Sequence, residues 1–146
     1  GISAFWSAEV EPFRIRVTTK WMPFIKHYGD VSAISGAELP PVDIITWGSP
    51  CQDLSIAGKR AGLGGSRSGL YVEAVRIVKE MLEATNGEYP KFCVFENVPG
   101  LLSSNDGADF YACLDMVQEL GFLPDVNILD AQFMGVPQRR KRVFIT

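Results

Sequence analysis

The sequence predicts an α/β fold in which a mostly parallel β-sheet is covered by helices on both faces. Short apolar runs typical of buried strands alternate along the chain with segments whose apolar residues recur at helical spacing. The chain has 146 residues, of which 47% are apolar and 21% are charged, and this balance is typical of one ordinary folded domain. We therefore expect strand–helix–strand units within a single domain.

The first 47 residues contain three predicted strands and one predicted helix. Residues 4–10 form a short apolar and aromatic run, and residues 26–28 form a second short run. Between them, Pro12 stands where the first turn of a helix tolerates proline, and apolar residues recur at every fourth position over 13–21. Residues 42–47 are β-branched and almost continuously apolar, as is typical of a strand buried on both faces of a parallel sheet.

A glycine-rich segment then interrupts the pattern. Residues 48–69 hold six of the fourteen glycines and show no periodicity, which predicts a loop. The elements expected beyond it are helices over 71–82 and 110–117, the second ending at Gly121, and strands over 92–95, 126–129 and 142–145. Ligands of such folds gather beyond the carboxyl ends of the strands, so the segments that follow strands are the candidates for function.

The net charge of −3 points away from nucleic acid, but the cations are unevenly distributed. Residues 48–69 carry a net charge of +2, and residues 138–142 carry +4. Because salt screens distant charges more than near ones, these two segments can form a local anion-binding surface on an otherwise acidic body.

The composition also excludes several classes of protein. No run of about eighteen apolar residues is present and the N-terminus does not resemble a signal peptide, so we expect a cytoplasmic protein with no membrane partner. The three cysteines are far apart and include no Cys-x-x-Cys pair, which predicts reduced thiols rather than disulfides. His27 is the only histidine, so no metal site is expected.

Cys51 is the candidate nucleophile. It follows the strand over 42–47 at the start of the glycine-rich segment, whereas Cys93 and Cys113 fall within a strand and a helix, where a thiol is usually a core residue. A thiolate at Cys51 would need cationic neighbours, which the arginines of the two basic segments can supply. A papain-like mechanism would need His27 as its base, and a lone histidine is more often structural.

Glu96 is the second candidate. It ends the apolar strand over 92–95, where a carboxylate is costly unless it has a partner or a chemical role. Such a group could exchange a proton with a substrate, or it could be only a capping or ion-paired residue. Asn97 would help to fix the following turn.

Three motifs in order resemble those of the DNA cytosine-5 methyltransferase family. They are the segment Gly48–Ser55, which contains Pro50-Cys51-Gln52, the triplet Glu96-Asn97-Val98, and the run from Gln138 to Arg142. Each is weak alone, but the three together, each in its expected strand context, make a specific match that covers nearly the whole chain. The resemblance implies a Rossmann-like fold that uses S-adenosylmethionine.

The resemblance also implies catalytic roles. Cys51 would attack C6 of cytosine, and Glu96 would engage N3 and the exocyclic amine. Arg142 would contact the base at O2, while Arg140 would support the thiolate and the loop. Further residues that would contact substrate or shape the loop are Gln52, Ser55, Arg67, Asn97 and Gln138.

For the methyl donor, the resemblance implies a site on several segments. Glu9 would bind the ribose hydroxyls and Val10 would lie against adenine, while Asp30 would accept from the adenine amino group. Leu70 and Pro50 would line the pocket near the methyl group. Without the resemblance, Glu9 could equally be a solvated residue at a helix start.

The family's glycine-rich first motif and its target-recognition region have no counterpart in this sequence. We therefore expect residues 1–146 to be part of a catalytic domain, incomplete at both ends, with the catalytic loop over about 48–69, and inactive when isolated. The expected partner is double-stranded DNA with the target base flipped out, in the cytoplasm or on the nucleoid of a bacterium. Two alternatives stay open: cytosine-5 methylation of a transfer RNA, and a catalytically silent module that binds nucleic acid.

Overall fold

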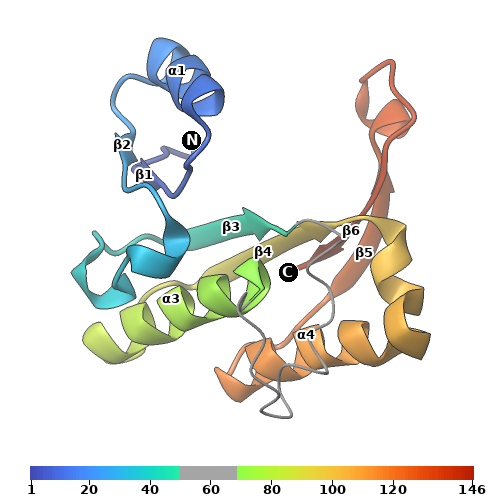
Figure 1. Cartoon of the computed structure of the whole chain (residues 1–146). Helices are drawn as coiled ribbons and strands as arrows, with labels where there is room; N and C mark the ends of the chain where they lie inside the picture. Colours follow the sequence, from blue (N-terminus) through green and yellow to red (C-terminus); the bar gives the residue numbers. More distant parts are fainter. Residues whose placement is uncertain (50–68) are drawn as a thin grey trace.

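The computed structural model describes residues 1–49 and 69–146. In this part of the chain, two sheets are formed (Figure 1). The smaller sheet pairs β1 (Trp6–Ser7) with β2 (Lys26–His27) in parallel. The larger sheet has the order β3-β4-β6-β5, and its strands are β3 (Ile44–Gly48), β4 (Phe92–Asn97), β5 (Val126–Asp130) and β6 (Lys141–Ile145).

The long helices occupy different places around these sheets. Helices α3 (Leu70–Ala84) and α4 (Ala108–Glu119) lie on one side of the larger sheet (Figure 1). Helix α1 (Pro12–Trp21) stands apart with β1 and β2, and it has no buried residue. Short 3₁₀ helices complete the chain: η1 (Val31–Ala33), η2 (Gly36–Glu38), η4 (Pro99–Gly107) and η5 (Ala131–Met134).

All the helices and strands predicted outside the glycine-rich segment are present, and each lies within a few residues of its expected bounds. In the larger sheet β3, β4 and β5 run in the same direction, as expected of a mostly parallel sheet, whereas β6 pairs antiparallel with both β4 and β5. A parallel crossover needs about a dozen residues or more. The ten-residue connection over 131–140 therefore turns the chain back as a hairpin, and we call residues 126–145 the hairpin arm.

The two faces of the larger sheet also differ, since within the described residues α3 and α4 both cover the same one. Alternate residues of β4 are buried, among them Cys93 and Phe95, while Phe92 on the other face is 64% exposed. On that same face, Ile44 in β3 and Leu129 in β5 are likewise exposed. The expectation of helices on both faces is thus met on one face, and we refer to the other as the open face.

The core lies between the sheet and the helices α3 and α4. Its centre is an aromatic group in which the Tyr71 ring meets Phe95 edge-on at 4.7 Å and Trp47 stacks on Phe95. Cys93 and Cys113 are both buried, as predicted for core residues, and desolvation raises the pKa of each thiol to about 12. Neither thiol is therefore suited to be a nucleophile near neutral pH.

Helix α3 is attached to the preceding segment by a close contact and an ion-pair cluster. A Cβ at Gly36 would collide with the backbone carbonyl of Ile77, so only glycine lets η2 approach the helix this closely. The Arg76 guanidinium donates to the backbone carbonyls of Val31 and Ile34 and pairs with Glu73 and Glu80. These contacts fix α3, whose first residue is Leu70, against residues 31–38.

Candidate active site

Glu96 lies at the carboxyl end of β4, on the open face of the sheet. In register it stands opposite Gly48 of β3 on one side and Phe144 of β6 on the other. A Cβ at position 48 would lie 3.3 Å from Glu96 Oε2, so the absence of a side chain at Gly48 leaves room for the carboxylate. The end of β3 and the end of β4 therefore form one site, as expected for strands that run in parallel.

Two arginines, Arg142 in β6 and Arg140 directly before it, hold one oxygen of this carboxylate. Arg142 Nε lies 2.8 Å from Glu96 Oε1, and Arg140 Nη2 lies 3.3 Å from the same atom. Side chains two residues apart share one face of a strand, and a long side chain reaches a diagonal neighbour on the next strand. The antiparallel direction of β6 is what brings its first residues to the carboxyl end of β4.

The two oxygens of the Glu96 carboxylate therefore have different surroundings. Oε1 receives both guanidinium groups, while Oε2 lies on the side of Gly48. The Glu96 side chain is 34% exposed, and Arg142 is more enclosed than Arg140, at 21% against 47%. Glu96 is thus oriented by its ion pairs, as the ion-paired interpretation expects, and it remains partly exposed to solvent.

Asn97 ties the end of β4 to the end of β3. It is 2% exposed, and its Nδ2 donates to the Ser49 carbonyl at 3.3 Å and to Ser49 Oγ at 3.2 Å. Its Oδ1 accepts the backbone N–H of Val98 at 2.7 Å, which fixes the turn after the strand, as predicted. Ser49 is the second residue of the glycine-rich segment, so Asn97 anchors the start of that segment.

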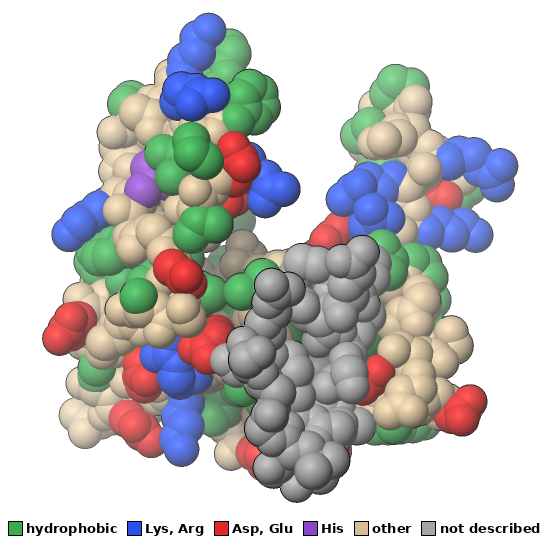
Figure 2. Space-filling view, viewed as in Figure 1, with side chains coloured by type: hydrophobic (Ala, Val, Ile, Leu, Met, Phe, Trp, Pro, Cys, Tyr) green, Lys and Arg blue, Asp and Glu red, His purple; other side chains and the backbone are tan. Residues whose placement is uncertain are grey.

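A large cavity opens between the N-terminal part of the chain and β3. Its volume is about 1190 Å³, and its walls include Glu9, Gly48 and Leu70. Figure 2 shows a hollow between the N-terminal unit, residues 1–30, and the hairpin arm, with Lys and Arg side chains on both sides. The structure thus brings together two of the residues that were expected to bind the donor.

Glu9 has the features of an acceptor for hydroxyl groups. Its Oε1 accepts the backbone N–H groups of Val10 and Glu11, and its Oε2 pairs with Arg14 at 3.3 Å. The backbone hydrogen bond from Glu11 is the main cause that lowers the pKa of the Glu9 carboxyl. A carboxylate offers about four acceptor positions, so this ionised group keeps capacity for a ligand.

The other described residues that were expected to bind the donor, Asp30 and Val10, do not line this cavity. Asp30 caps η1, because its Oδ1 accepts from the backbone N–H and the hydroxyl of Ser32, and these bonds lower its pKa. Asp30 does not line the cavity, although the next residue, Val31, does. Val10 is 63% exposed and also lies outside the cavity wall.

Some predicted site residues cannot be compared with the structure. Pro50, Cys51, Gln52, Ser55 and Arg67 lie outside the described residues, as does nearly all of the predicted catalytic loop. Gln138 is described and exposed in the hairpin arm, where its backbone N–H donates to the Val136 carbonyl at 2.7 Å.

Sequence and structure comparisons bear on this site. The whole chain, residues 1–146, matches the family described as C-5 cytosine-specific DNA methylase. The chain belongs to this family. It is 38% identical over 119 residues to the orphan methyltransferase M.SPRI of Bacillus phage SPR, a match that covers 82% of this chain and 26% of that protein. It is 36% identical over 137 residues to the type II methyltransferase M2.BsuMI of Bacillus subtilis, covering 94% of this chain and 34% of that protein.

The chain thus spans about a quarter to a third of the length of these curated relatives. Two solved structures share its fold. One is a DNA modification methyltransferase encoded within a prophage of E. coli, with a TM-score of 0.70 and 23% identity over 99% of this chain and 40% of that one. The other is the Dnmt2 methyltransferase of S. pombe, with a TM-score of 0.66 and 20% identity over 99% of this chain and 42% of that one. The expected Rossmann-like methyltransferase fold is therefore confirmed.

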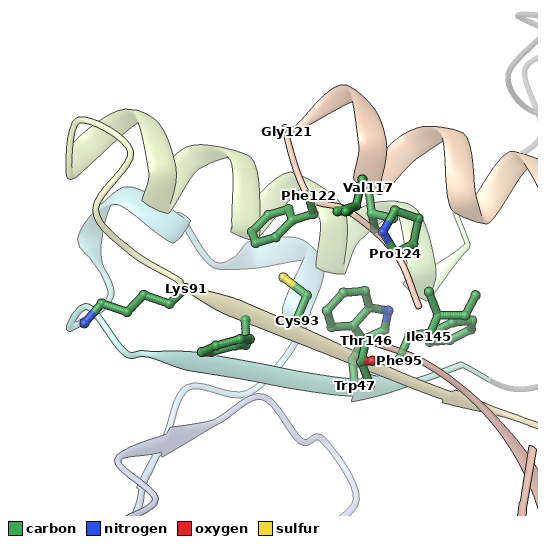
Figure 3. A pocket seen from close by; sticks show the side chains of 12 residues that line it. Trp47, Lys91, Cys93, Phe95, Val117, Gly121, Phe122, Pro124, Ile145 and Thr146 are labelled. Atoms are coloured by element: carbon green, nitrogen blue, oxygen red, sulfur yellow. The ribbon is translucent and has the colours of Figure 1, made fainter. Parts of the chain in front are cut away.

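Other features of the described residues lie outside this site. A second cavity, of about 320 Å³, lies on the helix side of the sheet among Trp47, Phe95, Val117 and Ile145 (Figure 3). It contains none of the residues expected to act. Within residues 1–49 and 69–146, no cluster of three potential metal ligands occurs, and no helix is long and apolar enough to cross a membrane.

Sequence reasoning missed two residues of the site. Gly48 was recognised as part of a motif but not as the space that the Glu96 carboxylate occupies. Asp130, at the end of β5, was not singled out at all, although its side chain accepts the backbone N–H of Arg140 at 3.0 Å. The signal for Asp130 would have been an acid directly before a ten-residue connection to the basic segment, which becomes informative only once the hairpin is known.

Proposed function

We propose that this methylase chain carries the catalytic residues of an enzyme that transfers a methyl group from S-adenosylmethionine to C5 of cytosine in double-stranded DNA. Residues 1–146 would form part of its catalytic domain, with the catalytic loop over about 48–69. The observation that carries the proposal is the Glu96 carboxylate, which Arg140 and Arg142 hold on one oxygen and which stands opposite Gly48, three residues before Cys51 in the sequence.

The chemistry requires a nucleophile because C5 of cytosine is itself a poor nucleophile. Addition of the Cys51 thiolate to C6 makes C5 enamine-like, so that C5 can accept a methyl group. Loss of the C5 proton and elimination of Cys51 then restore the ring. Since C5 and C6 are enclosed by stacking in a duplex, the base must be flipped out before Cys51 can reach it.

Glu96 would promote the attack from the other edge of the base. With a proton taken from solvent on Oε2, Glu96 would donate to N3 of the base, and this proton draws electrons from the ring and makes C6 more electrophilic. Among the described residues both arginines contact Oε1, so Oε2 would be the oxygen that meets the substrate. Arg142 uses Nε for Glu96 and Nη1 for the Lys141 carbonyl, and its remaining N–H groups can donate to the O2 atom of the base.

The cavity beside β3 is suited to the donor. S-adenosylmethionine, when bound, supplies a methyl group on a sulfonium centre. Glu9 would hold the ribose hydroxyls through its carboxylate, and Leu70 would contribute an apolar wall to the same cavity. Asp30, Val10 and Pro50 remain predicted contacts. On the other side of the hollow, the +4 segment over 138–142 provides cations for DNA phosphates.

A cysteine series tests this proposal on the intact protein. Cys51→Ser should reduce methyl transfer to cytosine-containing DNA by about 10³-fold or more, because a hydroxyl is a far weaker nucleophile than a thiolate. Cys93→Ser is the matched control, since it changes a buried thiol and should lower the melting temperature with little change in rate per folded molecule.

Radiolabelled S-adenosylmethionine, with DNA and transfer RNA as parallel acceptors, provides the measurement. Transfer of label to DNA that depends on Cys51 supports the proposal. Activity that survives in Cys51→Ser would contradict the mechanism, and label found only in transfer RNA would contradict the substrate. Absence of transfer to either acceptor by the intact wild-type protein would favour the silent binding module.

A further inference from the structure

Asp130 is a buried acid that the proposed chemistry does not use directly. It ends β5, is 8% exposed, and is one of three buried polar or charged residues in the described part of the chain, with Asn97 and Asp109. An acid is rarely buried unless its carboxylate is fully engaged. The partners of Asp130 therefore indicate what the residue does.

The Asp130 carboxylate bridges the two ends of the loop in the hairpin arm. Oδ1 accepts the backbone N–H of Gln132 at 3.2 Å and the backbone N–H of Arg140 at 3.0 Å. Oδ2 accepts Gln132 Nε2 at 2.8 Å. Two of these bonds are local, but the bond to Arg140 spans ten residues and joins β5 to the residue before β6.

This long-range bond fixes the backbone of Arg140, the residue whose side chain contacts the Glu96 carboxylate. The Arg140 carbonyl accepts the backbone N–H of Ala131 at 3.1 Å, so both backbone groups of Arg140 are held by the end of β5. The Arg140 side chain is 47% exposed and contacts Glu96 at 3.3 Å, so a shift of its backbone would move the guanidinium relative to the carboxylate. Its position consequently depends on its backbone.

We infer that Asp130 is a positioning residue, which fixes the backbone of Arg140 and so orients the Arg140 guanidinium on Glu96. The inference rests on the proposed function, because Glu96 is the group that acts on substrate. It assigns a role to a residue outside the three motifs. Outer residues that orient a catalytic group typically contribute about 10- to 100-fold in activity.

Three substitutions separate positioning from simple stabilisation. Asp130→Asn keeps an oxygen that can accept from Arg140 and should stay within about threefold of the wild-type rate. Asp130→Ser has a shorter acceptor that can still cap η5 locally but cannot reach Arg140, and it should lower kcat by about 10- to 100-fold with little change in KM for DNA. Gln132→Ala is the control, since it removes the local side-chain bond and leaves the Arg140 bond intact.

A double-mutant cycle and amide exchange complete the test. In an Arg140→Ala background, Asp130→Ser should cause less than about a twofold further loss, because the residue through which it acts is gone. Amide hydrogen exchange in the Asp130 variants should show that the Arg140 N–H is protected in Asp130→Asn and unprotected in Asp130→Ser. This second measurement needs no activity, so it tests the anchoring even if the proposed function fails.

Equal losses of rate from Asp130→Ser with and without Arg140 would overturn the inference, as would an Arg140 amide equally protected in both variants. A lower melting temperature with an unchanged rate per folded molecule would show a purely structural role and would also overturn it. Should Asp130→Ser not fold, Asp130→Asn decides alone: it must retain both the rate and the protection of the Arg140 amide.

Discussion

At the scale of single residues, the site depends on which neighbours contact each oxygen of Glu96. Two guanidinium groups contact Oε1, and the gap over Gly48 leaves space at Oε2. A carboxylate with exposed ion pairs contributes little to stability, typically about 0–1 kcal/mol. Stabilisation of the fold therefore does not by itself account for the arrangement, which agrees with the proposed role of Glu96 on a substrate.

Glu96→Gln tests this conclusion. The amide has nearly the same shape and can still hydrogen-bond a base, but it cannot exchange a proton as the carboxylate does, so turnover should fall by about 10²- to 10⁴-fold. DNA affinity depends mainly on phosphate contacts and should change little. Melting temperature, DNA affinity and single-turnover rate are measured on the same variant of the intact protein. A lower melting temperature with an almost unchanged rate would make Glu96 a structural residue.

The residues of the site differ in how far the sequence could predict them. Glu96, Asn97, Arg140 and Arg142 stand in short motifs, and the structure places all four around one carboxyl end. Asp130 escaped prediction because its partner is ten residues away, across a turn that no local pattern specifies. Gly48 escaped because what matters there is an absent side chain, which shows only beside a neighbouring strand.

At the scale of elements, the direction of β6 decides how the site is assembled. The sequence predicted the strand itself, but an alternating pattern of apolar residues does not specify direction. Running antiparallel to β4, β6 begins where β4 ends, and its first residues meet Glu96. A parallel β6 would have placed the same arginines beside the amino end of β4, far from Glu96.

The ion-pair cluster on α3 leads to a prediction about pH. Burial raises the pKa of the Glu80 carboxyl, but hydrogen bonds from Arg76 and the Gly36 backbone N–H, with the charge of Arg76, lower it by more, so that its net pKa lies below the usual value. A lowered folded-state pKa means that the stabilisation is present above the unfolded value, 4.5, and is lost as the pH falls through the folded value.

Glu80→Gln should accordingly lower the melting temperature at pH 7, by an amount equivalent to about 1 kcal/mol or less. The difference from wild type should shrink as the pH falls from about 5 to 3, because protonation removes the ion pair from the wild type as well. Thermal unfolding at several pH values provides the measurement. A difference that stays constant or grows over this range would exclude the Arg76 ion pair as its source.

At the scale of the whole molecule, a hollow separates the N-terminal unit from the hairpin arm (Figure 2). The N-terminal unit and the hairpin arm stand on either side of it, and cationic side chains are seen on both (Figure 2). A net charge of −3 would not predict a DNA-binding protein, yet the +4 segment lies on the hairpin arm beside Glu96. The distribution of charge is thus more informative than its sum.

The central claim is that Cys51 forms a covalent bond with cytosine, and a trapped adduct tests it most directly. Duplex DNA with 5-fluorocytosine at the target position cannot lose the C5 substituent as a proton, so the bond should persist after methyl transfer. With the intact protein and S-adenosylmethionine, we predict a denaturant-resistant complex whose modified peptide, identified by mass spectrometry, carries the nucleotide on Cys51. No such complex with the active wild-type protein, or its persistence in Cys51→Ala, would contradict the account.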